Sequence, residues 1–281
     1  MSVQGGPVAF VLGGGGVLGA TQVGMMGALL DHGVRADLIL GTSVGALNGA
    51  VMASDPTTAS VGKLTELWSS LSASGVFSDS LFTQAARLAR HRTHVHSPAP
   101  LRRLLREHLP VELIEELPVR FQCVAASIER SAAHWFDSGP IAEAVIASCA
   151  VPGLLPPARI GDEHFLDGGL VHSIPVGRAI QLGAREIYVL HVGRLEQPLR
   201  PPRWPWEVGL VAFEIARRHR FVEEMAGLPA DVTVHLLPSG DASAPLVSTS
   251  HRQLRLVPAR IERAYRASSE YLDRHDISER I

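Results

Sequence analysis

A serine stands between two glycines in the pentapeptide Gly41-Thr42-Ser43-Val44-Gly45, which has the pattern G-x-S-x-G. An apolar segment (36–40) precedes it and a segment of small residues (46–53) follows it, which predicts a sharp turn from a strand into a helix. Such a turn would expose the Ser43 hydroxyl at a helix N-terminus, where backbone N–H groups favour developing negative charge. The flanking glycines suit a turn in which a side chain would clash. Ser43 is therefore a candidate nucleophile.

A second glycine motif, Gly14-x-Gly16-x-x-Gly19, directly follows the apolar run at residues 8–12. Its position between a predicted strand and a predicted helix matches the dinucleotide-binding fingerprint. That fingerprint also requires an acidic residue at the end of the second strand, about 20 residues further on, to bond a ribose hydroxyl. The available acid, Asp37, begins that strand instead of ending it. The nucleotide-binding interpretation therefore fails its own requirement.

The same glycines suit a different anion, because the backbone N–H groups of Gly14, Gly15 and Gly16 can converge on the oxyanion of a tetrahedral intermediate. The ends of neighbouring parallel strands lie close together at one edge of a sheet. A glycine loop after the first strand and Ser43 after the second would therefore share one crevice. The sequence favours an oxyanion hole over a nucleotide site or a purely structural turn.

A serine nucleophile also needs a proton acceptor. An α/β-hydrolase would supply an acid and then a histidine downstream, and it would place its serine after several strands, whereas two predicted strands precede Ser43. Two arginine-rich stretches hold His91, His94, His96 and His219. We interpret these histidines as solvated surface residues.

The triplet Asp167-Gly168-Gly169 follows a short predicted strand at residues 164–166. A lone Asp-Gly-Gly is usually a turn, but two glycines would also let the backbone bring the carboxylate close to Ser43. An ordinary aspartate, with a pKa near ~3.9, is a weak base for a serine hydroxyl, so the site would have to desolvate Asp167 and raise its pKa. Asp167 is therefore the candidate base, provided that the site raises its pKa.

The glycine loop, the pentapeptide and the Asp-Gly-Gly triplet, in this order, resemble the patatin-like phospholipases, which are lipid acyl hydrolases with a Ser–Asp dyad. The stretch Ala147-Ser148-Cys149-Ala150-Val151-Pro152-Gly153 is similar to the Ala-Ser-x-x-x-Pro-Gly block that precedes the family's aspartate. The resemblance covers roughly residues 8–175. It implies that Ser43 is the nucleophile, that Asp167 is the general base and that the amides of residues 14–16 form the oxyanion hole.

One position departs from the family's pattern, because Leu18 stands where many relatives carry arginine. Backbone donors do not depend on that side chain, so ester hydrolysis is expected to survive, whereas the support for a phospholipid headgroup is weaker. The expected substrate is a lipid ester, and no cofactor or metal is needed. Two alternatives stay open: an acyltransferase using the same acyl-enzyme, and a nucleotide-binding module at residues 14–19.

The predicted elements alternate between strand and helix, which indicates an α/β sheet with helices on both faces. We predict strands at 8–12, 38–40, 120–127, 132–136, 164–166, 186–192 and 232–237, and helices at 19–32, 43–54, 141–150 and 251–274. The family's three-layer α/β/α sandwich around a mostly parallel sheet agrees with this rhythm.

Residues 56–118 lose the alternation, and we predict amphipathic helices there at 61–71, 81–89 and 101–109. We interpret this region as a helical insertion or cap within one patatin-like domain covering residues 1–281. Beyond residue 175 we expect generic elements without recognisable chemistry.

The composition is that of a globular chain, with 46% hydrophobic and 5% aromatic residues. The net charge of −2 argues against broad nucleic-acid binding. Cys123 and Cys149 lie in apolar runs and are interpreted as small buried thiols. The N-terminus is a poor signal peptide, and the apolar stretch 38–53 falls short of the ~20 residues needed to cross a bilayer. We expect a cytoplasmic protein without a transmembrane segment.

Two segments could meet a lipid surface. Residues 87–108 carry six arginines against one acid, Glu107, which suits anionic headgroups or equally a solvated basic face of a cap. Residues 199–213 place Arg200 and Arg203 before Trp204-Pro205-Trp206. Tryptophans beside arginines suit a membrane interface or a proline-rich connection that packs on the body. Peripheral membrane contact therefore stays open.

Overall fold

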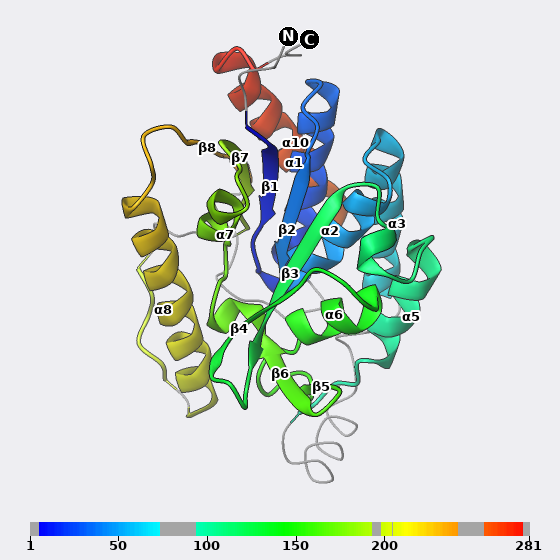
Figure 1. Cartoon of the computed structure of the whole chain (residues 1–281), viewed down its shortest axis with the longest axis vertical. Coiled ribbons are helices and arrows are strands. Elements are labelled where there is room, and N and C mark those ends of the chain that lie inside the picture. Colours follow the sequence, from blue (N-terminus) through cyan, green and yellow to red (C-terminus); the bar gives the residue numbers. More distant parts are fainter. Residues whose placement is uncertain (1–5, 74–93, 193–197, 204, 241–255, 278–281) are drawn as a thin grey trace.

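The computed structural model describes residues 6–73, 94–192, 198–203, 205–240 and 256–277 (Figure 1). The strands are β1 (Val8–Leu12), β2 (Leu38–Thr42), β3 (Arg120–Ser127), β4 (Ala132–Phe136), β5 (Ala158–Ile160), β6 (Glu163–Asp167), β7 (Glu186–Leu190) and β8 (Thr233–Leu236). The α-helices are α1 (Ala20–Asp31), α2 (Val44–Ser54), α3 (Thr58–Ala73), α5 (Ala99–His108), α6 (Ile141–Ser148), α7 (Val176–Gln181), α8 (Pro205–Ala226) and α10 (Val257–Arg274). The described part of the chain also contains the short 3-10 helices η1 (Gly16–Gly19), η2 (Ile114–Glu116) and η3 (Gly168–Leu170).

The strands form one sheet in the order β5-β6-β3-β2-β1-β7-β8, with β4 added to β3. The run β3-β2-β1-β7-β8 is parallel, whereas β4, β5 and β6 join antiparallel at one end. Parallel strands that are joined by helices are covered on both faces, so the central ones consist mainly of apolar residues. Strand β1, Val-Ala-Phe-Val-Leu, is an example.

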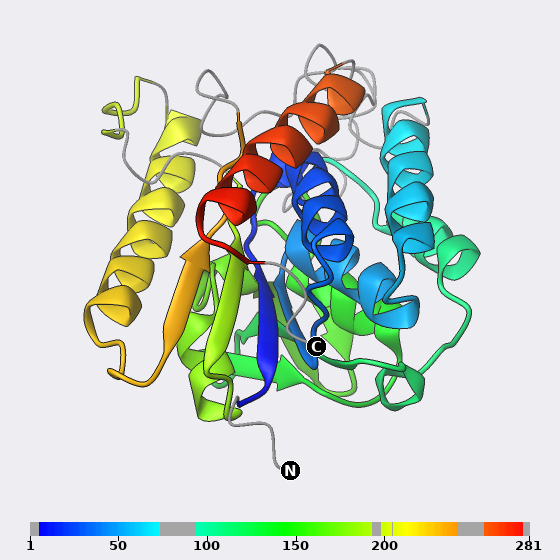
Figure 2. The same ribbon diagram turned by 90° about the horizontal axis from the view of Figure 1, so that it is seen from above.

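Alternate residues of β1 divide the interior into two cores. Phe10 and Leu12 face a large core shared with α1, α2, α3, α6 and α10. Ala9 and Val11 face a smaller core that includes Val176 of α7 and Phe221 of α8. Figure 2 shows α10, α1 and α3 gathered over the sheet. The predicted three-layer α/β/α sandwich around a mostly parallel sheet is therefore confirmed.

Most predicted elements are present, and the differences lie mainly in the C-terminal part. The strand β5 and the helix α7 were not predicted. The segment 205–213, for which a proline-rich connection was one interpretation, begins the 22-residue helix α8. Pro205 is tolerated there because it occupies the first turn, where a missing N–H costs no helical hydrogen bond.

Some predictions fall outside the described residues. These are the helix at 81–89, Trp204, and residues 251–255 of the last predicted helix, which begins at Val257 in the structure. Within the described part of the region 56–118, α3 and α5 form as predicted. Its interpretation as an insertion stays a prediction. None of the described helices combines the length and apolar character that crossing a bilayer requires.

Candidate active site

Strand β3 brings the ends of β2 and β6 together. Thr42, the last residue of β2, pairs with Val124, and Asp167, the last residue of β6, pairs with Ala125. Strand β4 also pairs with residues 123–127 of β3, the same residues that pair with the end of β2 and with β6. Each strand has only two edges for pairing, so β4 must occupy the opposite edge of β3. Strands β2 and β6 therefore share one edge of β3, run in opposite directions and meet at their C-terminal ends. This topology places Ser43 beside Asp167.

Ser43 occupies a strained turn between β2 and α2. Its backbone has φ 56° and ψ −126°, a conformation that residues other than glycine rarely adopt. The Ser43 N–H donates a hydrogen bond to Ser148 Oγ at 2.9 Å, and this bond holds the turn in place. On the inner side of the turn, a Cβ on Gly45 would collide with the Leu12 carbonyl. Ser43 itself is 8% exposed and lines a pocket.

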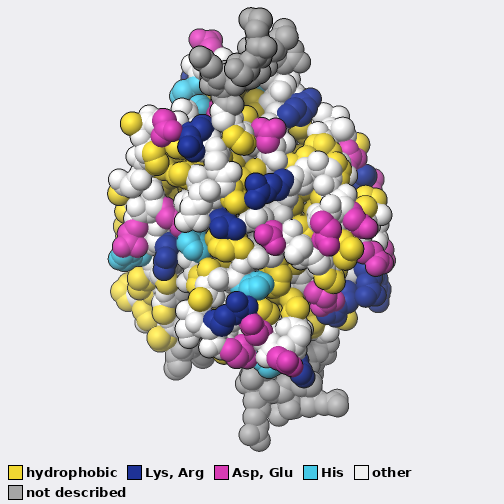
Figure 3. All heavy atoms as spheres, viewed as in Figure 1, with side chains coloured by type: hydrophobic (Ala, Val, Ile, Leu, Met, Phe, Trp, Pro, Cys, Tyr) yellow, Lys and Arg dark blue, Asp and Glu magenta, His cyan; other side chains and the backbone are white. Residues whose placement is uncertain are grey.

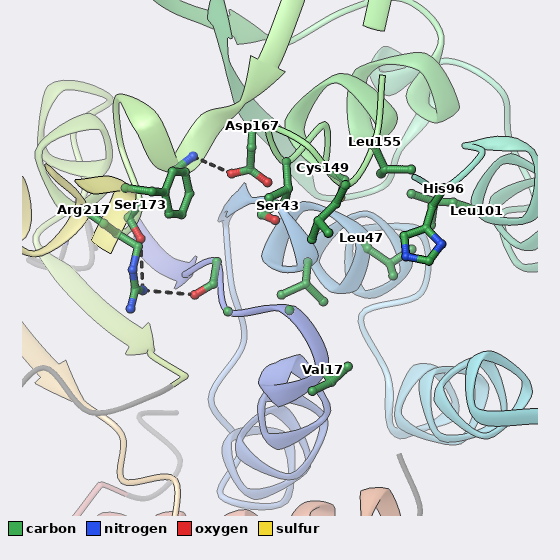
Figure 4. A pocket seen from close by; sticks show the side chains of 18 of the residues that line it. Val17, Ser43, Leu47, His96, Leu101, Cys149, Leu155, Asp167, Ser173 and Arg217 are labelled. Carbon is green, nitrogen blue, oxygen red and sulfur yellow. Dashed lines mark hydrogen bonds between the residues drawn. The ribbon is translucent and has the colours of Figure 1, made fainter. Parts of the chain in front are cut away.

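The Asp167 carboxyl is buried, at 1% exposure, and lies next to Ser43 (Figure 4). Its Oδ1 accepts a hydrogen bond from the Gly169 N–H at 2.7 Å, and Oδ2 has no hydrogen-bond partner among the described residues. Burial raises the pKa of Asp167 to about 6, although the Ser43 hydroxyl, the Gly169 amide and the charge of Arg217 each lower it. The carboxyl therefore has the raised pKa that a base for serine requires, and one oxygen free to accept a proton.

The glycine loop lies directly beside Ser43, since a Cβ on Gly14 would come within 3.2 Å of Ser43 Cβ. Its donors differ from the expectation in one respect. The Gly14 N–H donates to the Ser173 carbonyl at 3.1 Å and is occupied. In the described part of the chain, the N–H groups of Gly15 and Gly16 have no acceptor. The structure therefore leaves two of the three predicted amides available to an anion.

A buried polar network anchors both ends of this loop. Gln22 Nε2 donates to the Gly13 carbonyl at 2.8 Å, and Asn48 Nδ2 donates to the Gly19 carbonyl at 2.9 Å. Asn48 also donates to Gln22 Oε1 at 2.8 Å and accepts from Trp68 Nε1 at 3.0 Å. The role of Gln22 was not predicted. An amide side chain within a mostly apolar helix was the signal for it, because a buried polar group must be paired.

The pocket in front of Ser43 encloses about 160 Å³. Its walls come from segments far apart in the chain, and its apolar lining includes Val17, Val44, Leu47, Trp68, Leu71, Leu101, Val151, Leu154, Leu155 and Phe213. Ser43, Asp167 and the glycine loop form its polar end. An apolar cavity that ends on a nucleophile can hold an alkyl chain and present its ester carbonyl for attack.

Two expectations about the surroundings of the site were wrong. His96, expected at the surface, is 5% exposed and lines the pocket. The part beyond residue 175, expected to lack recognisable chemistry, contributes Phe213, Glu214 and Arg217 of α8 to the pocket. Both residue sets are brought in by packing between distant segments. His219 has a side chain that is 68% exposed, as expected, and His91 lies outside the described residues.

Both cysteines are free thiols. Cys123 is buried in β3 and Cys149 lines the pocket. Burial raises the pKa of each thiol, which keeps both protonated. Ser43 differs from both thiols, because its hydroxyl lowers the pKa of Asp167, whereas the charge of Asp167 raises the pKa of Cys149.

Comparison with known proteins identifies a family. A family model for patatin-like phospholipases matches residues 10–180. A patatin-like phospholipase domain-containing protein of Caenorhabditis elegans is 31% identical over 69% of this chain and 14% of its own length. A lysophospholipase NTE1 of Scheffersomyces stipitis is 32% identical over 66% of this chain and 12% of its own. This chain thus spans only a small part of these relatives.

Among solved structures, VipD from Legionella pneumophila has the same fold, with a TM-score of 0.50 at 16% identity. That match covers 98% of this chain and 68% of VipD. The family model covers more than half of the chain and contains the glycine loop, the serine turn and the Asp-Gly-Gly triplet in order. The chain belongs to the patatin-like phospholipase family.

Proposed function

We propose that this chain is a lipid acyl hydrolase that cleaves fatty-acyl esters with Ser43 as nucleophile and Asp167 as base. One observation carries the proposal: a buried carboxyl with a pKa of about 6 lies beside a strained serine at the polar end of an apolar pocket. Titratable groups with shifted pKa values cluster at functional sites. Family membership supports the same class of reaction.

In the first half of the reaction, Ser43 Oγ attacks the ester carbonyl and Asp167 takes its proton. The N–H groups of Gly15 and Gly16 accommodate the oxyanion of the tetrahedral intermediate. The intermediate collapses to an acyl-enzyme, and the leaving alcohol takes the proton back from Asp167. A base whose pKa lies just below neutral pH is ionised and still accepts a proton more readily than an ordinary carboxylate.

In the second half, water attacks the acyl-enzyme while Asp167 accepts the proton of that water. The second tetrahedral intermediate is held by the same two amides and expels Ser43, which regains its proton from Asp167. The product is a fatty acid. A single base serves both halves, so the reaction needs no histidine.

The substrate proposed is a lipid ester whose acyl chain fills the pocket. The apolar lining supports an acyl chain over a polar or charged acyl group. The Scheffersomyces stipitis relative is a lysophospholipase by name, which makes lipids with one acyl chain the first class to try.

We also propose peripheral contact with lipid surfaces through α5. The amphipathic helix buries Leu104 and Leu105 and leaves Arg103 and Arg106 exposed. Arg102 is instead held by Glu143 in a bidentate pair, with both distances 2.9 Å. In Figure 3, basic side chains are present on the side where α5 lies in Figure 1, with acidic side chains beside them, and both signs of charge are mixed over the whole face.

The direct test of the activity is a lipid panel assayed with wild type beside Ser43→Ala. The panel contains monoacyl and diacyl phospholipids, monoacylglycerol and triacylglycerol, and the readout is free fatty acid by mass spectrometry. We expect release from at least one class and a loss of at least about 10³-fold in Ser43→Ala, because removing a nucleophile leaves only residual catalysis. Equal release by both proteins would refute the proposal.

A further inference from the structure

A buried arginine of α8 reaches the glycine loop from the side opposite Ser43. Arg217 is 5% exposed. Its guanidinium forms a bidentate pair with Glu214 one turn earlier, with Nε to Oε1 at 3.1 Å and Nη2 to Oε2 at 3.0 Å. This pair compensates the charge of a guanidinium that is costly to bury. It also leaves Nη1 directed at the loop.

Arg217 Nη1 donates two further hydrogen bonds, to the Gly14 carbonyl at 3.3 Å and to Ser173 Oγ at 3.2 Å (Figure 4). The Gly14 N–H donates in turn to the Ser173 carbonyl at 3.1 Å. Gly14 is thus held at both of its backbone polar groups. A loop of consecutive glycines has no side chains to restrict it, so its conformation depends on such contacts.

The Gly14 carbonyl and the Gly15 N–H belong to the same peptide unit. That unit is planar and trans, so the two groups point in opposite directions. A hydrogen bond that holds the carbonyl towards Arg217 therefore aims the N–H away from Arg217. On Gly14 itself, a Cβ would lie 3.2 Å from Ser43 Cβ, so this part of the loop is next to the serine. The Gly15 N–H is one of the two amides without an acceptor in the described structure.

We infer that Arg217 is a positioning residue that orients the Gly15 N–H towards the oxyanion of the reaction. The inference rests on the proposed function, and it assigns a role to a residue outside the segment that the family model matches. Donation to the carbonyl also polarises the peptide unit, which strengthens the N–H as a donor. Lysine cannot replace Arg217, because one ammonium cannot keep a bidentate pair with Glu214 while reaching Gly14.

The test compares Arg217→Lys with Arg220→Lys. Arg220 lies on the same helix and is exposed. Both changes keep the charge. We expect Arg217→Lys to lower kcat by about 10- to 100-fold at unchanged KM, less than the 10²–10³-fold loss of a whole oxyanion donor. We expect Arg220→Lys to stay within about twofold of wild type.

A second readout separates positioning from a merely structural role. A fatty trifluoromethyl ketone forms a tetrahedral oxyanion adduct with an active serine, so its affinity depends on the oxyanion hole. Arg217→Lys should weaken this inhibitor by the same factor as kcat, with a melting temperature close to wild type. An unchanged inhibitor affinity, or a loss of kcat that only follows a loss of folded protein, would overturn the inference.

Charge alone could also link Arg217 to the site, since its charge lowers the pKa of Asp167. In that case Arg217→Lys would keep the wild-type kcat, and Arg217→Met would regain activity at higher pH. Either result contradicts positioning. A failure of the proposed function is distinguishable, because wild type would then release no fatty acid and would not bind the ketone, whatever stands at position 217.

Discussion

The proposed chemistry of this site depends on the environment of one carboxyl. Asp167 would be a poor base in water, but burial raises its pKa to about 6. Three groups act in the opposite direction: the Gly169 amide, the Ser43 hydroxyl and the charge of Arg217. The balance leaves a carboxylate that is ionised at neutral pH and keeps an unoccupied oxygen in the described structure.

This balance predicts the pH dependence of the reaction. Because the proposed reaction needs ionised Asp167, kcat/KM should be constant above pH 7 and fall tenfold per pH unit below pH about 6. Carboxyl groups ionise with little enthalpy and imidazoles with much, so the midpoint should barely move between 10 and 35 °C. The measurement is a pH–rate profile at several temperatures with a soluble ester. A midpoint that falls steeply with temperature would indicate a histidine base instead.

At the scale of elements, the site is built where strands end. Strand β1 ends in the glycine loop, while β2 and β6 meet end to end along β3 and deliver Ser43 and Asp167. The fit between α2 and β1 is close, because a Cβ on Gly45 would collide with the Leu12 carbonyl. The position of Ser43 therefore depends on the absence of a side chain at Gly45.

Replacing Gly45 by alanine should accordingly displace the serine turn. We expect a loss of about 1–3 kcal/mol in the free energy of unfolding, typical of overpacking, and a loss of most fatty-acid release. Gly62→Ala in α3 is the matched control, because a Cβ there meets no atom within 4 Å. It should stabilise the helix by about 0.5–1 kcal/mol and leave activity unchanged. Urea unfolding and the fatty-acid assay measure both effects, and wild-type behaviour of Gly45→Ala would contradict this packing.

The sequence predicted this arrangement where the signals are local. Apolar runs, glycines and the order of the motifs predicted the parallel strands, the serine turn and the candidate base. Sequence patterns did not predict contacts between segments that lie far apart in the chain. Nothing near Gly14 shows that Ser173 occupies its N–H, and nothing near Arg217 shows that α8 folds back onto the glycine loop. His96 was misplaced for the same reason.

At the scale of the whole molecule, the proposed function requires the pocket to meet a substrate that resides in a lipid surface. Leu101 of α5 lines the pocket, and Arg103 and Arg106 of the same helix are exposed. One helix therefore has an apolar side in the pocket and a basic side in water. This arrangement would bring the pocket to an anionic surface.

Charge reversal at Arg103 and Arg106 should weaken vesicle binding. We expect Arg103→Glu with Arg106→Glu to lose at least about tenfold in affinity for vesicles containing phosphatidylglycerol, since each basic residue near such a surface contributes about 1 kcal/mol. Arg263→Glu with Arg266→Glu, on α10, makes the same change in net charge as a control. Co-sedimentation measures both, and equal losses in the two double variants would show that only net charge matters.

The central claim is that Ser43 is activated by Asp167 without a histidine. Labelling with an organofluorophosphonate, mapped by mass spectrometry, tests it most directly in wild type, Ser43→Ala and Asp167→Asn. We predict an adduct on Ser43 in wild type, none in Ser43→Ala, and labelling slowed by at least about 10²-fold in Asp167→Asn. The last variant should melt no lower than wild type at pH 8, because it removes a buried charge that the fold disfavours. Labelling of Asp167→Asn at the wild-type rate, or an adduct on another residue, would contradict the account.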